Sequence, residues 1–351
     1  MTYVENVVSR IVSTSMSLPP LLALGRLDGR LSNSPARDIW LARARVSATA
    51  TIAGIAGVSV SIDDIMNWIC GRTPPPRHSE GLNDPMSVAA VMHFALTAQQ
   101  TPADDLTAAT FRILRTLLDD RAEAELWGPE DLARFSGAFR AAQAAIAAPY
   151  PSPTLLAVAE RLLEVQAALE VSPASDRTVT MIDGRQMILE PVSFGTIWMT
   201  ACQLPRALVA SGMATQILPS AVHLPRYLPN LAEELTRELE NTIGLASRQG
   251  LAELDRLEGR IANLPRVVEV TRRSRLPELL RLELAYPGLR VPAIARLLGV
   301  TPQAAAKLAA RSRELKESGR TNQGDRSQEW RPSPPLSFPS KNKKSQNPPK
   351  A

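Results

Sequence analysis

The stretch VPAIARLLGVTPQAAAKLAA, residues 291–310, decides the fold of the C-terminal part of the chain. Ile294 and Leu298 are four residues apart and share one helical face, while the small side chain of Ala295 lets a second helix come close. Gly299 adopts the left-handed backbone conformation that ends a helix more readily than a residue with a Cβ. The spacing therefore predicts a first helix that stops at Gly299, followed by a sharp turn.

A second helix is predicted to begin directly after this turn. Thr301 is a good N-cap, because its hydroxyl accepts from the free N–H groups of the first turn, and Pro302 has the preset φ of a first helical position. The residues expected to face the first helix are Val300, Ala305 and Leu308, and those expected to point outward are Thr301, Gln303, Ala306, Lys307 and Ala310. In a helix-turn-helix, such outward residues lie in the major groove of double-stranded DNA. The stretch thus predicts DNA binding, with a purely structural helical hairpin as the alternative.

The outward side chains suit a duplex in different ways. The amide of Gln303 donates and accepts at once, as reading an adenine edge requires, and Lys307 suits a guanine edge or a phosphate. The arginines better suited to backbone charge are Arg290, Arg296, Arg311 and Arg313. Ala306 and Ala310 make few polar contacts possible, so affinity is expected to depend on dimerisation and on phosphate binding.

A third helix is predicted immediately upstream, in residues 274–288, which read SRLPELLRLELAYPG. Its leucines on one face are Leu276, Leu279, Leu280 and Leu284, and a Pro-Gly pair closes it. A helix-turn-helix needs such a third helix to bury its core, so residues 271–330 are predicted to form one DNA-binding domain. The sequence leaves open whether the domain has a wing, which would follow Gly319 and be anchored by Trp330.

The charge of the chain is concentrated at the same end. Residues 271–351 contain 17 Lys and Arg against 6 Asp and Glu, a net charge of +11, whereas residues 1–270 contain 23 against 29, a net charge of −6. A basic module on an acidic body is typical of DNA-binding proteins, because Lys and Arg neutralise phosphates. Residues 331–351 are rich in Pro, Ser, Lys and Asn, which predicts a disordered basic tail.

The rest of the chain predicts a multi-helix body, so the expected fold class is mainly α. Helical patterns span residues 19–31, 34–56, 62–70, 84–98, 104–125, 129–147, 153–169 and 231–264. Ser152 is the expected N-cap of the helix that begins at Pro153. Asp183 and Gly184 lie between two β-prone runs and predict a small hairpin. The predicted domains are an N-terminal helical domain (1–176), a β-hairpin insertion (177–189), a helical subdomain with a long helix (190–270), the helix-turn-helix domain (271–330) and the tail (331–351).

The long helix carries an apolar stripe whose partner the sequence leaves open. The stripe consists of Leu254, Leu257, Ile261 and Leu264, at alternating spacings of three and four residues. Packing within one chain is the preferred interpretation, and pairing of two copies in a homodimer is the alternative.

Composition offers little for catalysis, metals or membranes. Cys70 and Cys202 are too few for a disulfide framework or a four-ligand metal site and are expected to be buried. The paired acids Asp63 and Asp64 are expected to complement a helix start. There is no apolar run of membrane length and no signal-peptide pattern, so the expectation is a cytoplasmic protein without cofactor, metal or membrane.

The N-terminal part contains the stretches LGRLDGRLSNSP (24–35) and ARVSATATIAGIAGVSVSIDDIM (44–66). These stretches resemble the segment that leads into Fic proteins, which transfer nucleotide groups to protein hydroxyls. A Fic enzyme needs a histidine base followed by a glycine-rich phosphate cradle, and none of His78, His93 and His223 is followed by one. His93 is expected to be a core residue, and the chain is not expected to be an enzyme.

The order of segments resembles an uncharacterised family of alphaproteobacterial proteins, frequent on rhizobial plasmids, with a Fic-like beginning and a C-terminal helix-turn-helix. The likeness is strongest over residues 274–320, SRLPELLRLELAYPGLRVPAIARLLGVTPQAAAKLAARSRELKESGR, and extends over most of residues 20–330. It implies a DNA-binding protein, either a transcriptional regulator or a plasmid-associated factor. The alternatives are a helical protein-interaction adaptor without DNA binding and a catalytically degenerate Fic-related protein.

Overall fold

The fold is known from a computed structural model that describes residues 19–73, 85–97, 106–110, 113–114, 137–170, 177–180, 186–189, 196–264 and 274–321. These residues are mainly helical, as predicted. The hairpin turn at Asp183 and Gly184, the wing and the tail of residues 331–351 lie outside the described residues.

The first part of the chain forms four helices where the sequence predicted them. They are α2 (Pro20–Asn33), α3 (Arg37–Ile55), α4 (Ile62–Ile69) and α5 (Pro85–Thr97). The start of α4 shows how local chemistry sets a boundary: the Ser61 hydroxyl accepts from Asp64 N–H at 3.1 Å, and the Asp64 carboxylate accepts from Ser61 N–H at 2.9 Å. Asp64 therefore has the helix-starting role expected from the sequence.

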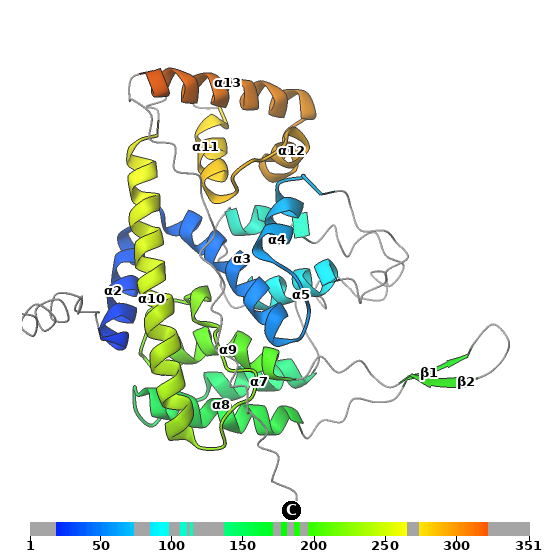
Figure 1. Cartoon of the computed structure of the whole chain (residues 1–351), viewed down its shortest axis with the longest axis vertical. Helices are drawn as coiled ribbons and strands as arrows, with labels where there is room; N and C mark the ends of the chain where they lie inside the picture. The colour runs from blue at the N-terminus through cyan, green and yellow to red at the C-terminus, as the bar shows by residue number, and fades with distance from the viewer. Residues whose placement is uncertain are drawn as a thin grey trace, which may run out of the picture.

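Three further helices, α7 (Gly137–Ala147), α8 (Leu155–Glu170) and α9 (Ile197–Ala210), pack together at the lower end of the molecule in Figure 1. The predicted start of α8 was wrong. The helix begins at Leu155, and the hydroxyl that accepts from Ala157 N–H, at 3.3 Å, belongs to Thr154. Thr154 N–H donates to Ser152 O at 3.0 Å, so the chain makes one more turn before it becomes helical.

Two short strands occupy the ends of the segment 177–189. Strand β1 (Arg177–Thr180) pairs antiparallel with β2 (Gln186–Leu189), with Arg177 opposite Leu189 and Thr180 opposite Gln186. They form a two-stranded sheet.

The longest helix, α10 (Ala232–Ala262), follows the short 3-10 turn η3 (Pro219–Ala221) and forms the spine of the body (Figure 1). It packs against α2, α3 and α8 of the same chain. The side chains of Leu254 and Leu257 are fully buried in this packing, whereas Ile261 and Leu264 are half-buried. The buried half of the apolar stripe is thus covered from within one chain.

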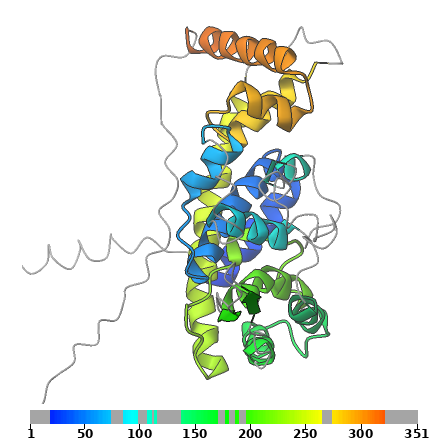
Figure 2. The ribbon, with the colours of Figure 1, turned by 90° about the vertical axis from the view of Figure 1, so that its right-hand side faces the viewer.

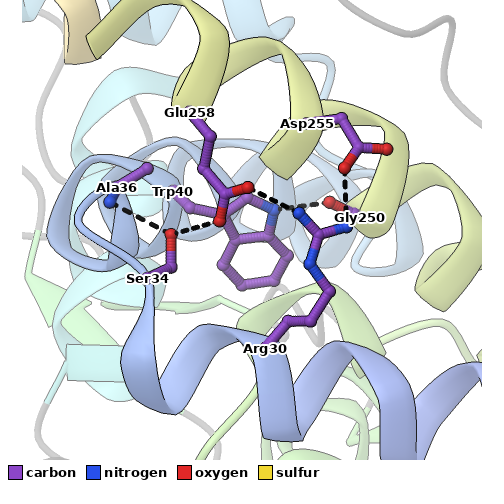
Figure 3. A network of polar contacts seen from close by, with 7 residues as sticks. All are labelled: Arg30, Ser34, Ala36, Trp40, Gly250, Asp255 and Glu258. Atoms are coloured by element: carbon purple, nitrogen blue, oxygen red, sulfur yellow. Dashed lines mark hydrogen bonds and ion pairs between the residues drawn. The ribbon is translucent and has the colours of Figure 1, made fainter. Parts of the chain in front are cut away.

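Helices α2 and α10 run in the same direction and are held by a polar junction (Figure 3). Arg30 donates to Asp255 and to Glu258, both at 2.6 Å. The Ser34 hydroxyl donates to Glu258 at 2.7 Å and accepts from Ala36 N–H at 3.1 Å, which fixes the turn into α3. This junction makes α2, the start of α3 and the second half of α10 one rigid unit.

His93 of α5 is a core residue, as predicted. It is buried, and its Nδ1 lies 3.1 Å from the hydroxyl of Thr49 on α3, while Nε2 has no hydrogen-bond partner among the described residues. Burial and the charge of Arg45 lower the pKa of His93 to about 3. The imidazole therefore stays neutral in the fold and is unsuited to proton transfer at neutral pH.

His93→Gln is expected to reduce the sensitivity of the fold to acid. Because the folded pKa of about 3 lies below the ordinary value of 6.5, the unfolded chain binds a proton at His93 between these values that the folded chain does not. The free energy of unfolding therefore falls as the pH drops below 6.5, by up to about 1.4 kcal/mol per pH unit. Urea unfolding at about pH 7 and about pH 5 should show a drop about 2 kcal/mol smaller in the variant than in the wild type. If the free energy of unfolding fell equally in the variant and the wild type between these two pH values, the lowered pKa of His93 would be contradicted.

The remaining expectations for the body concern its cysteines and membranes. Cys70 and Cys202 are free thiols, both buried as predicted, and burial raises the pKa of each. Among the helices of the described ranges, none combines the length and apolar character needed to cross a bilayer.

Candidate nucleic-acid interface

The last three helices gather at one end of the molecule. They are α11 (Leu276–Ala285), α12 (Val291–Leu298) and α13 (Pro302–Thr321), and α13 lies across this end in both views (Figure 1, Figure 2). Of the predicted leucine face of α11, Leu276, Leu279 and Leu280 are buried and Leu284 is only half-buried. Leu282 is buried as well, because α11 packs against both α13 and α3 and so covers more than one stripe.

The connection from α12 to α13 has the geometry that the sequence predicted. Gly299 lies in the left-handed region, with φ 63° and ψ 38°, and its N–H donates to Ala295 O. Val300 N–H donates to the same carbonyl at 3.0 Å. The Thr301 hydroxyl then accepts from Ala304 N–H at 3.2 Å, and α13 starts at Pro302. Local chemistry therefore fixes the direction in which α13 leaves α12.

The inner face of α13 is wider than the sequence indicated. Ala305 is buried and Val300 and Leu308 are half-buried, as predicted, but Ala309 and Ser312 are buried too. The Ser312 hydroxyl and the Lys316 ammonium both donate to Glu283 of α11, each at 2.6 Å. This contact seats the second half of α13 on α11.

The outer face of α13 contains the side chains predicted to read DNA. Gln303, Ala306, Lys307 and Ala310 are exposed, and so is Thr301 in the preceding turn. At 100° per residue, Gln303, Lys307 and Ala310 fall within an arc of about 60°. Arg311 and Arg313, also exposed, lie about 80° to either side of Gln303. The outer face of α13 thus has a polar centre in its first half, with Arg311 and Arg313 to either side of it but one to two turns further along the helix.

Carboxylates limit this face at its far end. Glu314 is exposed and falls within the same arc about two turns beyond Lys307, and the exposed Glu317 falls about 20° outside the arc, about three turns beyond Lys307. Glu314 accepts from Arg311 at 3.0 Å, with more than half of each side chain exposed. Such a surface ion pair is worth little, so Arg311 is able to exchange this carboxylate for another anion. Lys307 and Arg313 form no ion pair with a carboxylate of the described residues.

Arg290, the N-cap of α12, and Arg296, on α12 itself, lie beside the turn that follows α4. Both are exposed, and Arg290 N–H donates to Cys70 O at 3.0 Å. The sequence analysis missed a third arginine at this place, Arg72, whose guanidinium donates to Pro287 O at 3.3 Å. No local sequence pattern connects Arg72 with Pro287 or Arg290, which lie more than two hundred residues later in the chain. The only local signal is its position directly after Gly71, which indicates a turn.

The C-terminal helices share their core with the body. The Tyr286 hydroxyl, fully buried, lies 2.5 Å from the hydroxyl of Thr110. Arg281 forms an ion pair with Asp38 of α3, and Cys70 Sγ donates to Pro287 O at 3.4 Å. The apolar residues of α11, α12 and α13 belong to the same continuous core as those of α2, α3 and α10. The candidate interface is therefore held rigidly on the body.

The histidines and acidic residues of the described ranges do not gather into a metal site. Within those ranges, no three His, Cys, Asp or Glu side chains come together as metal ligands. Nδ1 of His223 lies 3.0 Å from Ser220 O, and burial lowers its pKa. His78 lies outside the described residues.

No model of a known protein family, no curated protein and no solved structure matches this chain. Its function has to be inferred from the arrangement of its own residues.

Proposed function

We propose that this chain is a sequence-specific binder of double-stranded DNA, in which α12, the turn 299–301 and α13 act as a helix-turn-helix. The observation that carries the proposal is the outer face of the first half of α13. It presents Gln303 and Lys307 at its centre, in a direction set by the left-handed turn at Gly299, and Arg311 and Arg313 lie to either side of this centre one to two turns beyond Lys307.

The shape of this face suits a major groove. The groove is wide enough to admit one α-helix, and the methyl side chains of Ala306 and Ala310 let α13 approach the base edges closely. Gln303 would pair with an adenine edge, and Lys307 with a guanine edge or a phosphate. Arg311 and Arg313 would then meet the phosphates on either side of the groove, while Thr301 is placed at the groove entrance.

The small number of base-reading side chains bears on how the protein would act. Two polar readers specify few base pairs, so we propose that the protein binds as a homodimer on two half-sites one helical turn apart. A transcriptional regulator or plasmid-associated factor in the cytoplasm, without catalytic activity, fits this mode of binding. The helical body would supply oligomerisation or signal sensing.

Gln303→Ala is expected to change the base preference at one position of the site. Loss of a bidentate contact costs about 1–3 kcal/mol of discrimination against the wrong base. The preferred duplex is first selected from a random pool with the full chain. Titration of single-base variants of that duplex then measures the loss, which should be confined to one base pair of each half-site.

Arg311→Ala is the matched contrast, since it removes a flanking charge and no base contact. It should weaken binding to the selected and to a scrambled duplex alike, and lower the slope of log affinity against log salt by about one. Equal losses on both duplexes for Gln303→Ala would contradict sequence reading by α13. Absence of binding to any duplex, with a stoichiometric protein partner recovered instead, would favour the adaptor alternative.

A further inference from the structure

We propose that Arg72, on the turn after α4, forms one phosphate-binding cluster with Arg290 and Arg296, so that the body and the C-terminal helices contact the same duplex. This inference rests on the proposed DNA binding. It extends the interface to an element that lies more than two hundred positions earlier in the chain.

Backbone contacts bring the three arginines together. Arg290 N–H donates to Cys70 O at 3.0 Å, which joins the start of α12 to the end of α4. Arg72 donates to Pro287 O at 3.3 Å from the other side of the same junction. A Cβ on Gly71 would lie 3.8 Å from an outer guanidinium nitrogen of Arg296, so Arg296 passes directly beside this turn.

Two glycines hold the junction in this form. Gly71 has φ 69° and Gly288 has φ 81°, a region that side chains with a Cβ rarely adopt. Each glycine also leaves room for the opposite segment: a Cβ on Gly71 would lie 3.3 Å from Ala293 Cβ, and one on Gly288 would lie 3.3 Å from an outer nitrogen of Arg72. The arginines are thus positioned by the two turns and by packing.

Within the described ranges, no carboxylate neutralises the charge of the cluster. Arg72, Arg290 and Arg296 are exposed, and none forms an ion pair with a carboxylate of the described residues. Arginines that join elements of the body behave differently: Arg30, Arg43 and Arg281 each face a carboxylate of another helix. The side chains of Arg72 and Arg296 and the backbone of Arg290 lie at one junction, and an anion that accepts hydrogen bonds from more than one guanidinium would be stabilised there.

Phosphodiester groups of a duplex are the anion that fits this position. Arg296 is three residues before the Gly299 turn, so the cluster borders the helix that carries the base-reading side chains. The planar, forked guanidinium matches phosphate oxygens. With α13 in the major groove, the cluster would bind phosphates of the adjacent DNA backbone and so fix the angle between the duplex and the helical body.

The test is Arg72→Gln in the full chain, with binding measured over a range of salt concentrations on the selected and the scrambled duplex. Loss of one phosphate contact should lower the salt slope by about 0.9 and weaken both duplexes several-fold and equally. The control is Arg237→Gln, an exposed arginine of α10 whose contact is with the backbone carbonyl of Glu233. It should leave slope and affinity unchanged.

Arg72→Lys separates charge from structure, because it keeps the cation and should retain the wild-type slope even if Arg72→Gln alters the turn. If Arg72→Gln keeps the wild-type slope of log affinity against log salt, the proposed cluster is wrong while DNA binding stands. The cluster is also wrong if Arg72→Lys loses as much of this slope as Arg72→Gln does. If the wild-type chain binds no duplex at all, the proposed function itself fails.

Discussion

Ala306→Glu is expected to lower the affinity for DNA at least 100-fold at about 150 mM salt without unfolding the protein, a loss of about 2.7 kcal/mol. Ala306 is exposed in the middle of the reading half of α13, so a carboxylate there would lie between the two phosphate backbones. Like charges brought together in an interface cost several kcal/mol. Glutamate is a good helix former, so α13 itself should persist.

The control for this substitution is Ala252→Glu, which places the same charge at an exposed alanine of α10. Its DNA affinity should stay within a factor of about three of the wild type, because its charge lies on a helix outside the groove. The melting temperatures of all three proteins should agree within a few degrees. An unchanged affinity in Ala306→Glu would exclude α13 from the groove, since the outer face of the helix tolerates no such charge in a duplex complex.

The turn and the outer face of α13 were predictable because their causes are local. Gly299 ends α12 through its own backbone preference, and Thr301 starts α13 through a hydroxyl that reaches only three residues along the chain. The exposed positions of Gln303 and Lys307 follow from helical periodicity. All of these features depend on neighbours within about one helical turn.

What the sequence did not reveal depends on contacts between distant residues. The bond from the Ser312 hydroxyl to Glu283 seats the second half of α13 on α11 and leaves Ser312 fully buried, whereas a serine on a helix predicts exposure. Arg72 joins the interface only because the α4 turn meets α12. The start of α8 shifted for a smaller reason, since two hydroxyl residues, Ser152 and Thr154, compete for the role of cap.

The apolar stripe of α10 shows the same limit at the level of a whole helix. The spacing of Leu254 and Leu257 predicted that they share a buried face, but it did not predict which helices cover that face. In the fold α2 lies alongside α10 in the same direction: Pro20 lies on Gly244, Leu27 on Gly250 and Arg30 beside Asp255. Because glycine has no side chain, Gly244 and Gly250 let α2 approach α10 closely. The leucine spacing of α10 does not predict this contact.

Trp40→Ala is expected to lower the free energy of unfolding by about 3–5 kcal/mol, the usual cost of removing a buried tryptophan. Trp40 is 2% exposed, and its indole N–H donates to Gly250 O at 2.9 Å (Figure 3). The ring and Leu27 lie so close to Gly250 that a Cβ there would be 2.9 Å from each. The truncation therefore opens a cavity where α2, α3 and α10 meet, and urea unfolding measures its cost.

Trp40→Phe keeps most of the ring and loses the hydrogen bond, so it should cost about 1–2 kcal/mol. If Trp40→Ala and Trp40→Phe lowered the free energy of unfolding by similar amounts, the packing of the indole ring would not stabilise the contact between α2, α3 and α10. Because Trp40 lies within the body and Ala306 on the exposed face of α13, the folded fraction of Trp40→Ala should bind DNA as the wild type does. Ala306→Glu should show the reverse: a wild-type free energy of unfolding and a lost affinity for DNA. The two variants therefore distinguish residues that stabilise the body from residues that contact the duplex.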